Sequence, residues 1–129
     1  MGQPAAKQGD TVVAVDTHII LPIPQPAPAV PVPHPFSGII DGGLSPDVKI
    51  QGLAAATVNS TATNTPAHLP IGGTFVIQPK DKAQIIKGSA RVTINGKPAA
   101  RAGDTALTCN DPVDLPNGTV VAVGTVFVA

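Results

Sequence analysis

One short unit occurs three times in this 129-residue chain, and it constrains the fold more than any other feature. Residues 2–10 read GQPAAKQGD, residues 48–60 read VKIQGLAAATVNS and residues 92–104 read VTINGKPAARAGD. In this register the Gly-x-x-Ala-Ala segments coincide, and each copy ends in Asp or Ser followed by Thr. Self-similarity of this kind indicates repeated supersecondary units that share one core. We therefore expect residues 1–129 to form a single domain of three units with pseudo-threefold symmetry.

Composition indicates that these units are built from strands and turns. The chain contains 13 Gly and 15 Pro, and relative to Ala each costs a helix interior about 1 and about 3 kcal/mol respectively. The alternating patterns Val48-x-Ile50 and Val92-x-Ile94 are typical of half-buried strands. With no Trp, no Tyr and three Phe, the core should be narrow and made of Val, Ile, Leu and Ala. The fold class predicted is all-β.

The first copy has no strand before it, and the C-terminus is the candidate to supply one. The chain ends in GTVVAVGTVFVA, where the spacing of Gly124 and Val128 matches that of Gly88 and Val92. A C-terminal strand in this position would close the three units into a ring. We therefore expect the two ends of the chain to lie side by side.

Residues 22–35, PIPQPAPAVPVPHP, contain seven prolines and cannot form a helix. Their composition predicts polyproline II structure along the surface. The PxxP spacings within the segment would also suit an SH3-type domain. A stiff wall is the favoured interpretation, because each proline lowers the entropy of the unfolded chain.

Charge argues against nucleic acid as a partner. Eight Lys and Arg balance eight acidic residues, so no net charge attracts a polyanion. Six of the basic residues fall between Lys80 and Arg101, but no aromatic residues interleave with them to stack on bases. The N-terminus lacks the features of a signal peptide, and we expect cytoplasmic synthesis without one.

Each of the three repeats is followed by a residue that can bind a metal, and in the third this residue comes after a shorter arm. His18 and His68 each lie eight residues after the last residue of their repeat, and Cys109 lies five residues after its repeat. Equivalent arms of a threefold unit end near its axis, so these side chains should meet. His34, which leaves the proline segment, is available as a fourth donor. Three imidazoles and a thiolate suit one structural Zn²⁺ per chain, although Cu(I) or Fe(II) would also accept this set.

Catalytic alternatives are weaker. A zinc hydrolase needs an open coordination position and a general base, usually Glu, and the sequence contains no Glu. Asp16 could serve as a base, but ligation by Cys109 would close the site to water. A nucleophilic pair of Cys109 and His68 lacks any surrounding nucleophile motif. We therefore predict that the chain is not an enzyme.

The segments PAAKQGD at residues 4–10 and GKPAARAGDT at residues 96–105 resemble the PAAR-repeat family. Its members are spike-tip proteins of bacterial contractile injection systems, in type VI secretion and in extracellular phage-tail-like particles. The resemblance implies a compact pointed β cone that holds zinc near its apex through three histidines and a cysteine, here His18, His34, His68 and Cys109. The central copy departs from the pattern with AAAT at residues 54–57, so the resemblance does not predict the conformation of its turn.

The same resemblance implies a function and a partner. One chain would cap and sharpen a trimeric VgrG or gp5-like β-helical spike, which pierces a target membrane with which the tip makes transient contact. The alternative is a carrier module that attaches toxic effectors as cargo to the spike. Strands around residues 48–51, 91–95 and 119–128 are candidates for the base that meets the spike. The expected location is the apex of the injection particle, from which the tip leaves the cell on firing.

Overall fold

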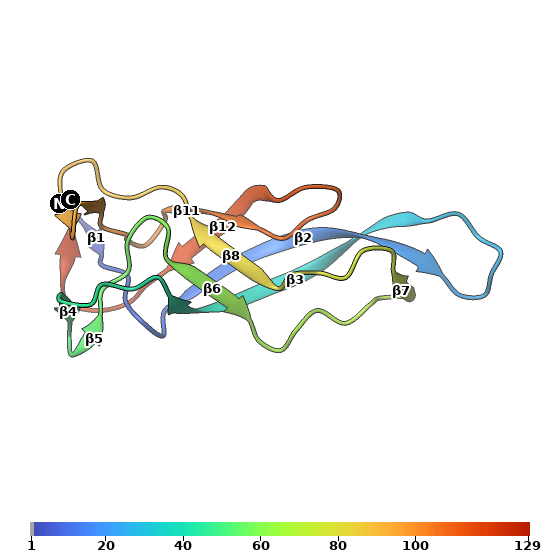
Figure 1. Ribbon diagram of the computed structural model, residues 1–129, viewed down its shortest axis with the longest axis horizontal. Coiled ribbons are helices and arrows are strands. Elements are labelled where there is room, and N and C mark those ends of the chain that lie inside the picture. The colour runs from blue at the N-terminus through green and yellow to red at the C-terminus, as the bar shows by residue number, and fades with distance from the viewer. Residues whose placement is uncertain (1) are drawn as a thin grey trace.

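The computed structural model describes residues 2–129, which form an elongated all-β molecule (Figure 1). These residues contain no helix, and therefore no helix that is long and apolar enough to cross a membrane. The predicted fold class is confirmed. The strands are β1 (Gln3–Pro4), β2 (Thr11–Pro22), β3 (Val30–Gly42), β4 (Lys49–Ile50), β5 (Leu53–Ala54), β6 (Thr61–Asn64), β7 (Gly73–Phe75), β8 (Lys82–Ile85), β9 (Thr93–Ile94), β10 (Lys97–Pro98), β11 (Thr105–Thr108), β12 (Leu115–Val121) and β13 (Phe127–Val128).

Three two-stranded pairs form the broad end, or base, of the molecule. β4 pairs with β5, β9 with β10, and β1 with the C-terminal β13, in which Gln3 lies opposite Val128. The predicted closure by the C-terminus is therefore confirmed, and both chain ends lie at this end (Figure 1). Met1, the expected neighbour of Ala129, lies outside the described residues.

The register of this closure differs from the predicted one by two residues. The backbone carbonyl of Val126 accepts a hydrogen bond from the N–H of Ala5, as that of Val92 does from Ala99. Val126, and not Val128, is thus the equivalent of Val92. The match based on glycine spacing was wrong because the two glycines occupy different places. Gly124 lies in the bend before its strand, whereas Gly88 lies ahead of the corresponding bend.

The three repeats meet in a closed ring of backbone hydrogen bonds at the base. The N–H of Ala6 donates to the carbonyl of Ala100 at 2.9 Å, that of Ala100 to Ala56 at 3.0 Å, and that of Ala56 to Ala6 at 3.0 Å. All three side chains are buried. Chains can approach this closely around an axis only where the side chains are small, which accounts for the Ala-Ala pair in every copy.

Each repeat then makes the same turn, including the degenerate central copy. In the first and third copies the final Asp carboxylate accepts a hydrogen bond from the N–H three residues earlier, at 3.0 and 2.9 Å. In the central copy Ser60 Oγ accepts from the Thr57 N–H at 2.9 Å. Before the final residue the backbone φ is positive at Gly9, Asn59 and Gly103, and Asn tolerates this conformation better than most residues.

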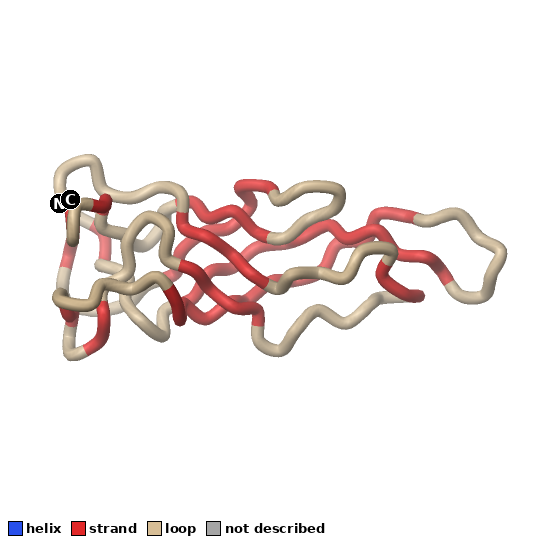
Figure 2. Tube along the Cα trace, in the orientation of Figure 1, coloured by secondary structure: helices blue, strands red, loops and turns tan. Residues whose placement is uncertain are grey.

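From the base, three hairpins extend along the long axis: β2–β3, β6–β8 and β11–β12. β3 pairs with β6, β8 with β11, and β12 with β2, which closes a six-stranded barrel. β2 has 12 residues and β3 has 13, whereas the other four strands have four to seven. Only the first hairpin therefore reaches the distal tip, and the molecule narrows toward it (Figure 2).

The second half of the proline segment is not polyproline II. Residues 30–35 begin β3 and pair with β2. Pro31 and Pro33 lie opposite Ile19 and Thr17, whose carbonyls accept hydrogen bonds instead from the N–H groups of Val76 and Asp111, at 3.1 and 2.8 Å. The prolines thus occupy pairs that need no hydrogen bond from them, which is where a strand tolerates proline.

The core is narrow, as composition predicts, but it is not built from leucine. Among residues 2–129 no leucine is fully buried, while Phe36 is. Alanine dominates because the barrel interior tapers to the axis. The main cluster comprises Ala6, Val12, Phe36, Ile40, Ala56, Ala62, Ala83, Ile85, Ala100, Ala106, Cys109, Val120 and Ala122.

Enlarging the alanine ring should destabilise the whole molecule. Ala100→Val adds two methyl groups where three backbones meet, and overpacking of this kind costs about 1 to 3 kcal/mol. Ala29→Val, in the exposed distal loop, is the control and should change the free energy of unfolding by less than about 0.5 kcal/mol. Urea denaturation measures both. Equal stability of the two variants would contradict a tightly packed ring.

Candidate metal centre

The inward face of β2 is aliphatic near the base, polar at Asp16 and His18, and aliphatic again at Ile20. Alternate residues of this strand face inward, and in order from the base they include Val12, Asp16, His18 and Ile20, each of which is buried. The aliphatic residues near the base continue the main core. The polar residues lie in the distal half, where only side chains from neighbouring elements can satisfy them.

All four residues predicted as metal ligands meet in this region. His18 comes from β2 and His34 from β3, while His68 lies between β6 and β7, and Cys109 directly follows β11. Each of them is buried. The imidazole centroids of His18 and His68 are 4.9 Å apart, those of His18 and His34 5.5 Å, and those of His34 and His68 5.7 Å.

A fifth group, the carboxylate of Asp16, lies among them. The donor atoms of Asp16, His18, His68 and Cys109 all lie within 4.8 Å of one another. His34 is not a member of this group, but its Nε2 is buried and has no hydrogen-bond partner. The described residues thus offer imidazole nitrogens, one thiol and one carboxylate in one buried place, which is chemistry suited to a metal ion.

Neighbouring groups orient the imidazoles. The Nδ1–H of His34 donates to the Val32 carbonyl at 2.8 Å, which leaves the Nε2 lone pair free. His18 Nδ1 lies 3.5 Å from a carboxylate oxygen of Asp111, on the side of the ring away from Cys109, whose Sγ is 3.8 Å from Nε2. A hydrogen bond such as that of His34 fixes the ring orientation of metal-binding histidines, whereas the Nδ1 of His18 makes none with the described residues.

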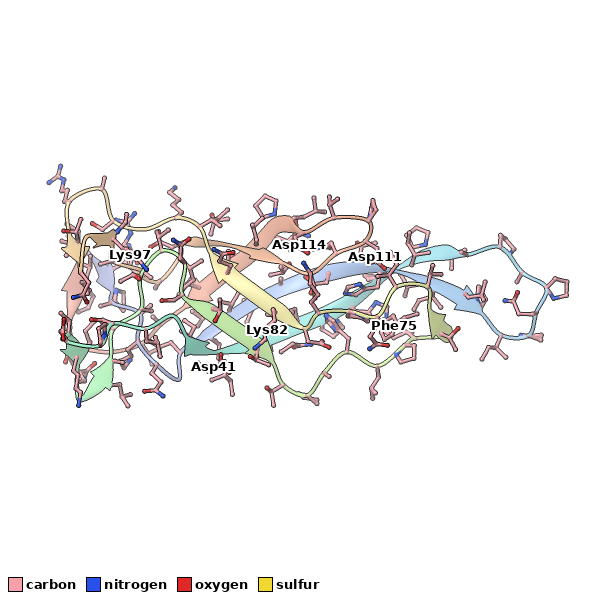
Figure 3. All side chains as sticks on the ribbon, viewed as in Figure 1. Asp41, Phe75, Lys82, Lys97, Asp111 and Asp114 are labelled. Carbon is pink, nitrogen blue, oxygen red and sulfur yellow. The ribbon has the colours of Figure 1, made fainter. Side chains whose placement is uncertain are left out.

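Aromatic rings enclose the cluster. Phe75 packs against His18 and His34 with centroid distances of 5.8 and 5.5 Å, and Phe36 packs against His68 at 5.9 Å. In Figure 3 Phe75 and Asp111 lie near each other in the distal half, far from Lys97 at the base. Two surface clefts of about 380 Å³ each approach the cluster, one lined by His34 and His68 and the other by His18 and Cys109.

Burial keeps the thiol and an imidazole neutral in the protein without metal. Burial, followed by the charge of Asp16 and a hydrogen bond to it, raises the pKa of Cys109 to about 12. Burial lowers the pKa of His18, and the nearby His68 lowers it further, while Asp111 and Asp16 act in the opposite direction. Neutral imidazole is the metal-binding form, whereas the thiol must lose its proton when it binds a metal.

Asp16 was missed as part of this cluster by sequence reasoning, which considered it only as a catalytic base. The signal was present in the strand alternation, because Asp16 and His18 are two residues apart and therefore share a face of β2. Registry of the repeats could not find it, since no corresponding carboxylate precedes His68 or Cys109.

Fold and cluster together define a class: a pseudo-threefold β cone whose narrow half encloses a group of metal-competent side chains. A family profile, the PAAR motif, matches residues 31–114. The chain therefore belongs to the PAAR-motif family, structural proteins with a role at the spike tips of contractile injection systems. The match includes His34, His68 and Cys109, and the alanine ring adds the first repeat by structural equivalence. No curated protein matches the chain.

The raised pKa of Cys109 predicts how stability depends on pH. In metal-free protein the native state holds the thiol proton up to a pH of about 12, whereas the unfolded thiol ionises near pH 8.5. Stability from this group is therefore complete below about pH 8.5 and is lost as the pH rises above it. The sequence has no Tyr and no second Cys. Its six lysines also titrate in the upper part of that window, but a variant that lacks only the thiol retains them.

Urea unfolding of metal-free protein between pH 7 and pH 10 measures this effect. The free energy of unfolding should fall more steeply with pH in the natural sequence than in Cys109→Ala, which has no thiol. Parallel curves for the two proteins would contradict the raised pKa.

Proposed function

We propose that this protein is the structural tip of a contractile injection system, and that it caps and sharpens a trimeric β-helical spike. The observation that carries the proposal is the base, where three equivalent strand pairs surround one backbone ring. A trimer ends in three identical strand edges, and exposed edges are prone to unwanted pairing. A single chain with three similar units can cover all three edges at once.

The base also presents apolar side chains to a partner. Val48, Leu53, Val126 and Phe127 are exposed there, and Phe127 keeps 60% of its surface accessible. Aromatic residues such as phenylalanine are enriched in protein interfaces relative to the rest of the surface. The partner proposed is a VgrG or gp5-like spike protein, bound with one tip per trimer.

For the metal centre we propose one structural Zn²⁺ held by His18, His34, His68 and Cys109. The free and buried Nε2 of His34 supports its inclusion. These four residues come from β2, β3, the segment before β7 and the segment after β11, so one ion would tie together all three hairpins where the barrel narrows. Zinc binding contributes about 10 to 16 kcal/mol in small structural sites, and we propose that it stiffens the tip.

The distal end has the surface expected of a tip that enters a membrane. Ile23 in the hairpin loop is 70% exposed, and Leu69, Ile71 and Val76 around β7 are also exposed. Apolar residues gathered at a narrow end lower the cost of transient contact with lipid. In this role the protein is mechanical and not catalytic, and it acts at the apex of the particle after synthesis in the bacterial cytoplasm.

Metal analysis tests the proposed centre. Purified protein should contain one zinc per chain by elemental analysis. Removing the metal with a chelator, or His68→Ala, should lower the melting temperature by 10 °C or more, since even a few kcal/mol shifts a domain of this size by that amount. A melting temperature that does not respond to metal would contradict a structural role.

Co-purification with the trimeric spike protein tests the capping function. Phe127→Asp places a charge on the exposed face of the base and should reduce recovery of the complex at least tenfold. Val15→Asp is the matched control, because Val15 is 61% exposed but lies on the wall of β2; it should leave recovery unchanged. Equal loss in both variants would contradict docking through the base. Recovery of effector proteins without the spike would favour the carrier alternative.

A further inference from the structure

Asp16 is a buried carboxylate without a cationic side chain beside it. Its exposure is 0%, and among residues 2–129 its one ion-pair contact is with His68. Its hydrogen bonds come from Thr108 Oγ at 2.5 Å, Cys109 Sγ at 3.4 Å and His68 Nε2 at 3.0 Å. A buried charge is costly unless a counter-charge or a metal compensates it.

Charge balance links this carboxylate to the metal centre. Three neutral imidazoles and one thiolate would leave a buried Zn²⁺ with a net charge of +1. The carboxylate of Asp16 reduces this to zero in the same buried volume. The negative charge of Asp16 and the positive charge of the metal site thus neutralise each other.

The distances around Asp16 fit donors that share one ion. With Zn–N near 2.0 Å and Zn–S near 2.3 Å, two donors that share one ion lie no more than about 4.0 Å apart, or about 4.3 Å when one is sulfur, whatever the coordination number. Asp16 Oδ2 lies 3.0 Å from His68 Nε2 and 3.4 Å from Cys109 Sγ, and Cys109 Sγ lies 3.8 Å from His18 Nε2.

The contact with His68 has two chemical interpretations. A nitrogen that binds a metal has no proton to donate, so Nε2 of His68 cannot both bind the ion and donate to Asp16. If Nε2 is a ligand, then two lone pairs face each other at 3.0 Å. This arrangement is favourable only where a cation lies between the two atoms.

Building on the metal centre proposed above, we infer that Asp16 is itself a metal ligand. Its Oδ2 joins the donors of His18, His68 and Cys109, which lie within 4.8 Å of it and of one another. The buried, unpartnered Nε2 of His34 moves in as the fifth donor when the ion binds, and the site is electrically neutral. Its other oxygen remains held by the Thr108 hydroxyl.

Cobalt substitution of the full chain tests this role. In the natural protein Co²⁺ should show the charge-transfer band of the Cys109 thiolate together with the weak d–d bands of five-coordination. Asp16→Asn should keep the thiolate band, convert the d–d bands to the stronger pattern of a four-coordinate site, and lower metal affinity at least tenfold. Asp111→Asn is the control: Asp111 lies 3.5 Å from His18 Nδ1 and outside the donor group, so its loss affects affinity but should leave the d–d bands unchanged.

X-ray absorption of the natural zinc protein gives a result that does not depend on a variant folding. Four N or O neighbours and one S are expected, and three N or O neighbours and one S would overturn the role of Asp16. Identical cobalt spectra and affinities for the natural protein and Asp16→Asn would also overturn it. If the natural protein binds no metal at all, the metal centre itself fails, which is a separate outcome from a four-coordinate site.

Discussion

The structure depends on the closed ring of hydrogen bonds among Ala6, Ala56 and Ala100. In an ordinary sheet each backbone group pairs with a neighbouring strand, and two edges remain open. Here three short segments donate to one another in a cycle, so a single chain reproduces the symmetry of a trimer. The ring fixes the directions in which the three hairpins leave the base, and their barrel closes because each begins from an equivalent position.

The sequence predicted the parts of the fold that repeat. Three copies of one unit and the density of Gly and Pro were enough for the all-β class and the closure by the C-terminus. What could not be predicted is where the repeats differ. Nothing in the spacing of Gly124 reveals that Val126 takes the place of Val92, because that register is set by hydrogen bonds to Ala5. Proline composition likewise predicted polyproline II where pairing with β2 decides the conformation.

The same division holds for the candidate metal centre. Registry of the repeats brought His18 and His68 together, because equivalent positions in a symmetric molecule converge on its axis. It placed Cys109 on the third arm, although at a shorter distance from its repeat. Asp16 breaks the symmetry, and it was overlooked for that reason. It belongs to the one hairpin that extends beyond the others, so its role depends on the inward face of β2 and not on the repeat. Strand alternation was the signal that could have identified it.

The symmetric and asymmetric halves of the molecule suit different tasks. A base that meets a trimer must present three similar surfaces, and the repeats maintain this similarity even where Ser60 replaces Asp. At the distal end the threefold pattern is lost, because only β2 and β3 continue there while the other two hairpins stop. Extending one hairpin and ending two narrows the barrel, but it leaves the interior of the long hairpin short of aliphatic neighbours. Polar side chains occupy that interior, and an ion that binds them would replace the cohesion that a hydrophobic core supplies at the base.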